Sequence, residues 1–324
     1  MTLSVLQPMS VLNLDLTKEI QRLKREKNAV ILAHNYQISQ VQDVADYIGD
    51  SLKLSRLAGE TDASYIIFCG VHFMAETASI ISPDKKVLIP DLDAGCSLAS
   101  SINPNELLKW KNENPDAIVV SYVNTSAEIK ALSDYCCTSS NAVKIVQNIP
   151  RESTILFLPD MFLGAYVAEV TKRKNIKIWP GECHVHAGIT NNDINSMLQK
   201  YKDAEFMVHP ECSCTSSTLY HISKGDINRD SKILSTEGMM TEARLSKNNQ
   251  FLIATEVGIL HRMREENPSK DFIPIKSDAI CKYMKKITIE KVHNSLVNDV
   301  YEVKVPEKIA RKALIPIERM LAIS

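Results

Sequence analysis

The chain has 324 residues, of which 44% are hydrophobic and 24% charged, and 38 Lys and Arg stand against 39 Asp and Glu, a formal net charge of −1. High apolar content with low net charge excludes a disordered chain. The charge balance also removes the electrostatic reason to expect nucleic-acid or membrane-surface binding. At roughly 150 residues per domain, the length alone suggests two domains.

From the sequence we expect neither a membrane helix nor a leader segment. Its longest apolar runs, such as residues 65–71, are far shorter than the roughly 20 residues that a membrane helix needs. Residues 1–16 have no basic start and no small-residue cleavage site, so we expect an N-terminal arm. Eight cysteines without a secretion signal argue against a disulfide framework. We therefore expect a cytoplasmic protein, or one of an organelle stroma if the gene is organellar.

Short β-branched runs alternate with amphipathic stretches along the whole chain. The strands predicted in chain order are 30–33, 65–69, 87–89, 118–121, 155–158, 176–179, 206–208, 251–254 and 272–275. Helical patterns include 19–26, 106–113, 143–148 and 194–201. Continuous apolar strands separated by helices are typical of parallel sheets covered on both faces. The predicted fold class is therefore α/β.

Three segments repeat one order of helix, linker, strand and polar residues, at 16–36, 105–124 and 192–211. The landmarks of the repeat are a polar residue just past the strand, a hydroxyl residue at a predicted helix start, and a cysteine. They are His34, Tyr122 and His209, then Ser51, Ser139 and Thr236, and finally Cys96, Cys183 and Cys281. The third copy is longer by about ten residues within 212–235.

Because of this recurrence, we expect three domains and not the two that the length suggests. They are predicted to be similar three-layer α/β/α domains with parallel sheets, in pseudo-threefold arrangement around a central site. The predicted bounds are an arm at 1–16, α/β domains at 17–103, 104–190 and 191–288, and a C-terminal helical extension at 289–324.

Ligands of open α/β sheets bind beyond the carboxyl ends of the strands. Three units that face one another would bring the residues after their strands together. Those residues are His34, Asn35, Tyr36, Tyr122, Asn124, His209 and Glu211. Hydroxyl residues at three helix N-termini would add a pocket for an anionic ligand. The alternative is that each of these hydroxyls is an ordinary N-cap.

Cys96, Cys183 and Cys281 occupy equivalent places in the three units. Three thiolates suit a cubane iron–sulfur cluster in which one iron lacks a protein ligand and acts as a Lewis acid. Three dispersed ligands favour chemistry at the cluster over electron transfer. The alternative is three cysteines without a special role, and a non-catalytic iron–sulfur sensor would use the same trio.

A zinc site is a further alternative. Cys183 and His186 are spaced as C-x-x-H, and His209 precedes Cys212 and Cys214 closely. A zinc-dependent hydrolase built on Cys183, His186 and His209 is therefore conceivable. The chain lacks paired C-x-x-C knuckles, however, so the signal for structural zinc is poor, and we expect Cys212 and Cys214 not to be ligands.

Long motifs spread from about Asn28 to Leu296 resemble the quinolinate synthase family. In the first third of the chain they are HNYQ at 34–37, GDSL at 49–52, CGVHFMAE at 69–76 and AGCSLA at 94–99. The middle third carries SYVNTSAEIKALSDYCCTSSNAVK at 121–144, FLPDMFLG at 157–164 and GECHVHAGI at 181–189. The last third carries HPEC at 209–212, STEGM at 235–239, ATEVGILHRM at 254–263 and CKYMKKITIEKV at 281–292.

The resemblance implies a pseudo-threefold three-domain protein with a 4Fe–4S cluster on three cysteines. Members condense iminoaspartate with dihydroxyacetone phosphate, with loss of phosphate and two waters, to quinolinate for NAD biosynthesis. The matching cluster ligands are Cys96, Cys183 and Cys281. The matching substrate residues are His34, Tyr36, Ser51, Tyr122, Val123, Asn124, Ser139, His209, Pro210, Glu211 and Thr236. The implied partners are these two small molecules and, as a further candidate, the enzyme that produces iminoaspartate; nucleic acid and membrane are not expected, and the oligomeric state stays open.

Among these residues, Glu211 is the expected main base. Tyr36 and His34 have the acid–base range to move protons near the substrate carbonyl. Tyr122 and Asn124 are expected to position the intermediate.

Overall fold

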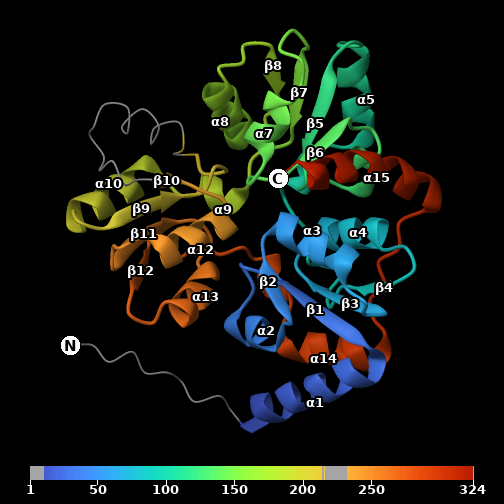
Figure 1. Cartoon of the computed structure of the whole chain (residues 1–324), viewed down its shortest axis with the longest axis vertical. Coiled ribbons are helices and arrows are strands. Elements are labelled where there is room, and N and C mark those ends of the chain that lie inside the picture. Colours follow the sequence, from blue (N-terminus) through green and yellow to red (C-terminus); the bar gives the residue numbers. More distant parts are fainter. Residues whose placement is uncertain (1–10, 214, 216–231, 324) are drawn as a thin grey trace.

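The computed structural model describes residues 11–213, 215 and 232–323 and contains three four-stranded sheets in which all pairings are parallel. The strand orders are β2-β1-β3-β4, β6-β5-β7-β8 and β10-β9-β11-β12, which is one topology repeated three times along the chain. Figure 1 shows the three sheets in three separate lobes. We call each sheet with its helices a unit, numbered in chain order. The predicted α/β class and the three similar units are confirmed.

The first unit begins with the long helix α1. Its strands are β1 (Ala29–His34), β2 (Tyr47–Gly49), β3 (Tyr65–Cys69) and β4 (Lys86–Leu88). Its helices are α1 (Val11–Lys27), α2 (Ser39–Val44), α3 (Ser51–Glu60), α4 (His72–Ile81) and the 3-10 turn η1 (Ala99–Ser101). Residues 11–16 of the predicted arm thus belong to α1, and its residues 1–10 lie outside the described residues.

The second unit repeats the pattern with shorter helices. Its strands are β5 (Ile118–Tyr122), β6 (Tyr135–Cys137), β7 (Ile155–Leu158) and β8 (Ile176–Ile178). Its helices are α5 (Pro104–Asn112), α6 (Ala127–Lys130), α7 (Ala142–Gln147), α8 (Met161–Thr171) and α9 (His184–Ala187).

The third unit contains β9 (Glu205–Val208), β10 (Lys232–Ile233), β11 (Gln250–Ala254) and β12 (Asp271–Pro274). Its helices are α10 (Asn191–Lys200), α12 (Thr236–Leu245), α13 (Ile259–Glu266) and the 3-10 turn η2 (Met284–Lys286). Most of the predicted insertion within 212–235 lies outside the described residues.

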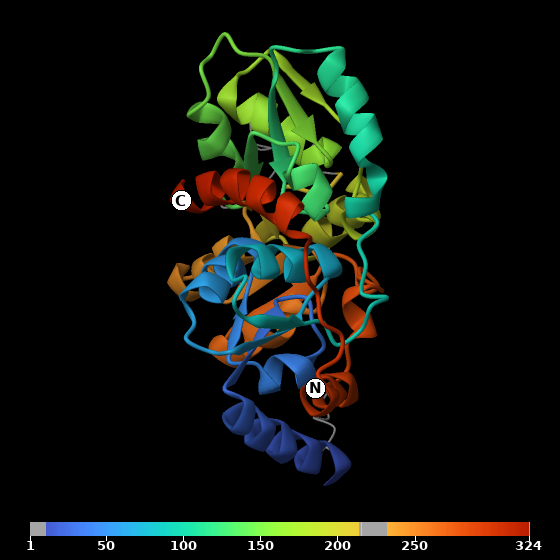
Figure 2. The same cartoon turned by 90° about the vertical axis from the view of Figure 1, so that its right-hand side faces the viewer.

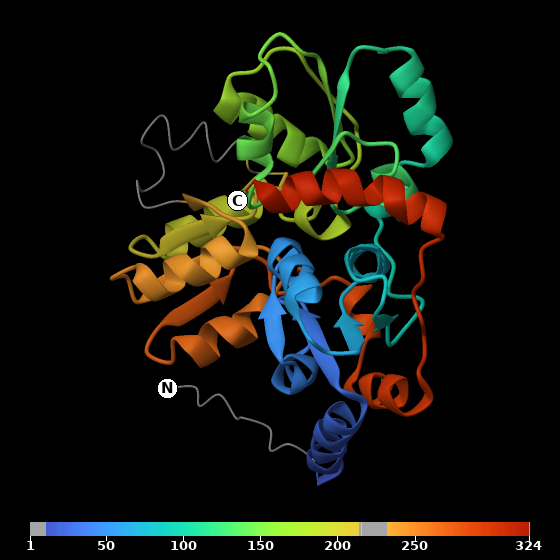
Figure 3. The ribbon, with the colours of Figure 1, turned by 45° about the vertical axis from the view of Figure 1, so that its right-hand side comes forward.

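Two final helices follow, α14 (Ile289–Asn298) and α15 (Glu307–Ala322). Helix α14 packs on α1 and β3 of the first unit, whereas α15 contacts both α4 and the α6–β6 region of the second. Figures 2 and 3 show α15 lying between these two units. The Asn141 amide of the second unit donates to the Met320 and Ile323 carbonyls at the end of α15. The C-terminal segment therefore joins the first unit to the second.

Each of the nine predicted strands is present, and each sheet also contains one strand that was not predicted. The missed strands are β2, β6 and β10. They have three residues or fewer and lie at the edge of their sheets, so they carry too few positions for a hydrophobic period. The inner strands are buried on both faces, as for Ile31, Leu32 and Ala33, which explains their continuous apolar runs.

Local capping explains where several helices start. Asn103 and Glu106 form a reciprocal capping box at α5 with Pro104 in the first turn, and Thr190 and Asp193 do the same at α10. Within the described residues, no helix is long and apolar enough to cross a membrane.

Arg173 cross-links several backbone carbonyls of the second unit. Its side chain is buried, with 7% of the residue exposed, and donates to the backbone carbonyls of Val146, Ile149, Pro150 and Ser153. Removal of the guanidinium would leave several of these carbonyls without a donor.

We expect Arg173→Met to lower the free energy of unfolding by about 3 kcal/mol, because buried carbonyls lose charged donors. The measurement is urea denaturation. Lys172→Met is the matched control, because the neighbouring Lys172 pairs only with the exposed Glu169 and should change stability by less than about 0.5 kcal/mol. Equal effects of the two substitutions would contradict this role for Arg173.

An ion pair between α2 and α13 joins the first unit to the third. His261 Nε2 lies 2.6 Å from Asp43 Oδ1, and this hydrogen bond raises the pKa of His261 above its ordinary value. A pKa that is raised on folding stabilises the folded state below the unfolded pKa of about 6.5. The stabilisation is lost as the pH rises through the higher folded pKa.

We therefore expect Asp43→Asn to lower the pKa of His261 in an NMR titration. The substitution should cost stability at pH 6 and almost none at pH 9, and the cost stays below about 1 kcal/mol because both side chains are partly exposed. An unchanged pKa of His261 would show that the pair does not form in solution.

Candidate functional site

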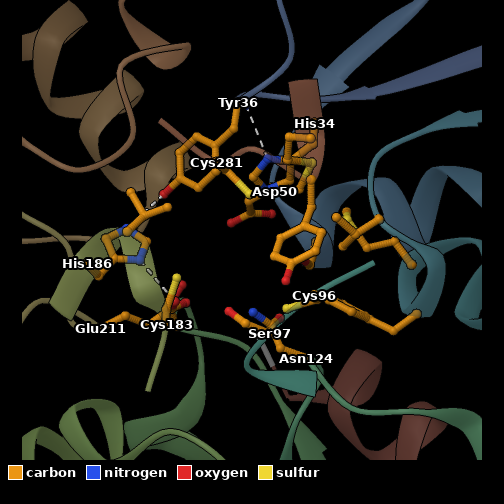
Figure 4. Close-up of a pocket in the computed structure, with 18 of the residues that line it drawn as sticks. His34, Tyr36, Asp50, Cys96, Ser97, Asn124, Cys183, His186, Glu211 and Cys281 are labelled. Carbon is orange, nitrogen blue, oxygen red and sulfur yellow. Dashed lines mark hydrogen bonds and ion pairs between the residues drawn. The ribbon is translucent and has the colours of Figure 1, made fainter. Parts of the chain in front are cut away.

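One pocket is lined by residues of all three units (Figure 4). It contains the three predicted cysteines and most of the predicted substrate residues: His34, Tyr36, Ser51, Tyr122, Asn124, Ser139, His209, Glu211 and Thr236, with Cys96, Cys183 and Cys281. The structure therefore brings these residues together, while their individual roles stay predictions.

Val123 and Pro210, also predicted to contact substrate, are buried but do not line this pocket. One pattern recurs in all three units. The outer residues of the triplets 34–36, 122–124 and 209–211 line the pocket and the middle residue does not. The first and third triplets lie in turns, closed by the bonds from the Gln37 amide to the His34 carbonyl and from the Cys212 amide to the His209 carbonyl. The middle residue in the first unit is Asn35.

The strand ends account for the place of each triplet. His34 and Tyr122 are the last residues of β1 and β5, and His209 follows β9 directly. Each of these three strands is an inner strand of its sheet, so its carboxyl end lies in the middle of the sheet edge. Parallel pairing brings neighbouring strand ends to that same edge, where ligands of α/β proteins bind.

The predicted hydroxyl residues lie at helix starts, but not as N-caps. The N-cap of α3 is Asp50, whose carboxylate accepts from the Lys53 amide at 2.9 Å. The N-cap of α12 is Ser235. Ser51 and Thr236 are therefore the first helical residues, and the capping alternative is wrong for both. Their hydroxyls are not used by the helix and are available to the pocket.

Ser139 differs from the prediction, because α7 starts three residues later at Ala142. Ser139 lies in the turn before the helix, and its neighbour Ser140 bridges the units. Ser140 Oγ donates to Asp50 Oδ2 at 2.7 Å and lies 3.0 Å from Ser235 Oγ. The residues beside the three predicted hydroxyls are thus hydrogen-bonded to one another, which holds the three segments together.

Glu211 is a buried carboxylate surrounded by groups from two units. The Tyr122 hydroxyl donates to its Oε1, and His186 Nδ1 lies 3.2 Å from its Oε2. Burial by itself raises the pKa of Glu211, but His186, His209 and the Tyr122 hydrogen bond outweigh burial and lower the pKa to about 2. Glu211 is therefore an anion at neutral pH.

The same burial keeps the neighbouring groups neutral. It lowers the pKa of both His34 and His209 to about 3, against the opposing pull of the Glu211 charge. Burial and the Glu211 charge raise the pKa of Tyr36 and Tyr122 well above its ordinary value. His34 and His209 are therefore neutral imidazoles, and Tyr36 and Tyr122 protonated phenols, around the Glu211 carboxylate.

Two buried groups, the pocket residue His186 and Thr255 behind it, were not predicted in the role that the structure gives them. The Tyr36 hydroxyl lies 2.5 Å from Thr255 Oγ1, and Thr255 in turn lies 2.9 Å from His186 Nε2. His186 thus links Tyr36 to Glu211, although the sequence considered it only as a zinc ligand. Thr255 is the first residue after β11, and the strand-end rule applied to that strand would have found it.

The three cysteines share one local geometry. Backbone amides two and three residues later lower the pKa of each thiol: Leu98 and Ala99 for Cys96, Val185 and His186 for Cys183, and Tyr283 and Met284 for Cys281. The Ala99 amide donates to Cys96 Sγ at 3.5 Å. Each cysteine precedes a short helical turn, namely η1, α9 or η2. Figure 4 shows the three thiols in the same space.

These thiols fit a polycationic group. Burial raises the pKa of Cys96 to about 12, and the nearby Cys281 adds to the shift. Burial, Glu211 and Cys96 also raise the pKa of Cys183. Three adjacent thiolates repel one another, so they need a highly charged metal group to stay deprotonated. Their six amide donors stabilise the charge of sulfur ligands.

A smaller set of donors overlaps this group. Cys183, His186 and Glu211 have ligand atoms within 4.8 Å of one another. This set differs from the zinc site considered from the sequence, because it contains Glu211 in place of His209. Cys212, expected not to be a ligand, is disulfide-bonded and does not line the pocket.

Comparisons with known proteins agree with this geometry. Residues 18–322 match the family model described as quinolinate synthetase A protein. The quinolinate synthase of Thermus thermophilus is 54% identical over 308 residues, which are 95% of this chain and 97% of that protein. The quinolinate synthase of Pyrobaculum aerophilum is 55% identical over 305 residues, 94% of this chain and 98% of that protein. The quinolinate synthase of Mycobacterium leprae is 53% identical over 306 residues, which are 94% of this chain and 87% of that protein. The chain therefore belongs to the quinolinate synthase family of enzymes.

Proposed function

We propose that this chain condenses iminoaspartate with dihydroxyacetone phosphate to quinolinate, with release of phosphate and water, in the pocket that the three units share. The observation that carries the proposal is the composition of that pocket. One pocket contains three thiols, a buried carboxylate, protonated phenols and hydroxyl residues at helix starts. Family membership supplies the reaction, and the described residues supply a place for each of its chemical needs.

Anionic substrates are held in this proposal by hydrogen bonds and helix ends. Ser51 and Thr236 start α3 and α12, each of ten residues, and the N-terminus of a helix attracts carboxylate or phosphate. Neutral His34 and His209 add one N–H donor each. No cationic side chain lines the pocket in the described part of the chain, in keeping with the balanced overall charge.

Asn124 has the features of a positioning residue. Its Oδ1 is buried and has no hydrogen-bond partner among the described residues, while the residue lines the pocket. A buried acceptor without a partner costs free energy unless a ligand satisfies it. We infer that Asn124 accepts a hydrogen bond from the bound intermediate.

Proton transfers are assigned by protonation state. Glu211 is deprotonated and serves as the base, and Tyr36 and Tyr122 are protonated and serve as acids or donors. The low pKa of Glu211 makes it a weak base in the empty pocket. Binding of an anionic substrate nearby raises the pKa of a carboxylate, so Glu211 becomes a stronger base once substrate is present.

Cys96, Cys183 and Cys281 would hold a 4Fe–4S cluster through their sulfurs. When bound, such a cluster supplies a Lewis-acidic iron with one open position. The chain contributes the thiols, the amide donors to them, and a partly buried wall formed by Tyr283 and Met284.

We expect Cys96→Ala, Cys183→Ala and Cys281→Ala each to abolish both iron binding and quinolinate formation, since a cubane on three ligands does not persist on two. Anaerobically purified wild-type protein should contain about four irons per chain. Iron analysis, the visible spectrum and anaerobic turnover of the two substrates measure this.

The matched control is Cys69→Ala, because Cys69 is a free, buried cysteine in β3 outside the pocket. It should keep iron and activity. Retention of iron by Cys183→Ala, or its loss in Cys69→Ala, would contradict the ligand assignment.

We expect Glu211→Gln to keep the iron and the binding of quinolinate but to lower turnover by at least roughly 100-fold, because the amide cannot accept a proton. Steady-state kinetics and calorimetry on the anaerobic enzyme separate the two effects. Glu265→Gln, an exposed carboxylate outside the pocket, is the control. Near-normal turnover of Glu211→Gln would move the role of base to another residue.

A further inference from the structure

Asn35 lies between two pocket residues but points away from the pocket into a buried polar network. The residue is fully buried. Its Nδ2 donates to Thr236 Oγ1 at 2.8 Å and to Glu237 Oε1 at 3.3 Å, and its Oδ1 accepts from Arg262 Nη1 at 2.8 Å. The contact therefore joins the strand end of the first unit to α12 and α13 of the third.

Arg262 fixes which way the amide of Asn35 faces. A guanidinium has only donors, so the oxygen of Asn35 must face Arg262 and its NH₂ group must face Thr236. Arg262 is itself held in place, because its Nη1 lies 2.5 Å from Glu237 Oε1 and its Nε 2.6 Å from Glu266 Oε1. Only 8% of Arg262 is exposed.

The direction of this hydrogen bond determines what Thr236 can do. Because its hydroxyl oxygen accepts from Asn35, its own proton is free to be donated elsewhere. Within the described part of the chain, that hydroxyl makes no other hydrogen bond. Thr236 lines the pocket and is 2% exposed, so the partner for this proton is a molecule in the pocket.

Ser51 and Ser139 line the same pocket, and among the described residues no side chain donates to their hydroxyls as Asn35 does to Thr236. Asn35 thus distinguishes Thr236 from the other two hydroxyl residues. A hydroxyl that already accepts one hydrogen bond is a better donor, because hydrogen bonds in a chain polarise one another at low dielectric.

We propose that Asn35 and Arg262 are positioning residues that orient the Thr236 hydroxyl to donate its proton to an anionic oxygen, a carboxylate or a phosphate, of the ligand. Neither residue touches the ligand. The inference rests on the proposed function to the extent that an anion binds in the pocket.

The test is the change Asn35→Asp, which preserves shape and strengthens the pairing with Arg262 but replaces the donor to Thr236 by an acceptor. The Thr236 hydroxyl then donates to residue 35 and is lost to the ligand. We expect the affinity for the ligand to fall about tenfold, the effect of one hydrogen bond to a charged group. The thermal midpoint falls as well, because the new carboxylate oxygen replaces an NH₂ group that lies 3.3 Å from Glu237 Oε1.

Binding is measured by calorimetry on anaerobic holoenzyme with two probes, pyridine-2,3-dicarboxylate and inorganic phosphate. Asn35→Asp is also combined with Thr236→Val. In this background the Thr236 hydroxyl is absent, so the aspartate can change binding only through its added charge. We expect the tenfold loss to shrink to less than about twofold in that background for one of the two probes, and that probe identifies the anion that Thr236 contacts. Thr236→Ser, which keeps a hydroxyl, should bind like the wild type.

The matched control is Asn114→Asp, which likewise places a carboxylate beside a cation, because Asn114 accepts from Lys177 far from the pocket. It should leave both affinities unchanged. Equal losses from Asn35→Asp with and without the Thr236 hydroxyl, for both probes, would overturn the inference and leave the proposed function standing. If neither probe binds to the wild type, the proposed function is overturned as well.

If Asn35→Asp does not fold, Arg262→Gln provides the second test. It removes the cation that fixes the amide and should weaken binding about threefold, since the amide can then turn over. This loss should also vanish in the Thr236→Val background. A loss that persists there would overturn the inference.

Discussion

The burial of the Glu211 carboxylate is the interaction on which the rest of the pocket depends. A charge removed from water is costly unless hydrogen-bonded and paired. The chain satisfies it with Tyr122 and His186 from another unit. The second and third units must therefore dock correctly before Glu211 can be both buried and ionised. Burial of His34 and His209 themselves keeps both imidazoles neutral against the Glu211 charge, while burial and that charge together keep both tyrosines protonated.

Repetition of one unit explains how so small a chain builds such a pocket. Each copy contributes the end of an inner strand and a cysteine in front of a short helical turn. The junction of Ser140 with Asp50 and Ser235 then ties together the segments that carry the hydroxyl residues. In the proposed function, an anionic ligand would be met by hydroxyls, helix N-termini and neutral imidazoles, without a basic surface.

The sequence predicted the inner strands and the residues after them because both have strong local signals. Short apolar runs, rich in β-branched residues in β1 and β5, mark β1, β5 and β9, and the repeat locates His34, Tyr122 and His209 at their ends. Edge strands such as β2 were missed because three residues show no period. Val123 and Pro210 do not line the pocket, which the match of motifs alone does not reveal, because the chain bends or turns at both positions.

Other features could not be read from the sequence because they depend on how the units pack. The N-caps at Asp50 and Ser235 shift the predicted hydroxyls by one residue, which changes them from caps to free donors. The contacts of His186 with Glu211 and of Asn35 with Thr236 join residues far apart in the chain. A hydrogen-bond direction that depends on a third residue, Arg262, is visible only when all three are placed.

The central claim is that three units build one site around three cysteines and a carboxylate. Its most direct test is a crystal structure of anaerobically prepared protein with quinolinate, phased to show iron by anomalous scattering. The account predicts iron bound to Cys96, Cys183 and Cys281, with quinolinate in the same pocket in contact with residues of all three units. A single metal ion held by Cys183, His186 and Glu211, or quinolinate bound outside this pocket, would contradict it.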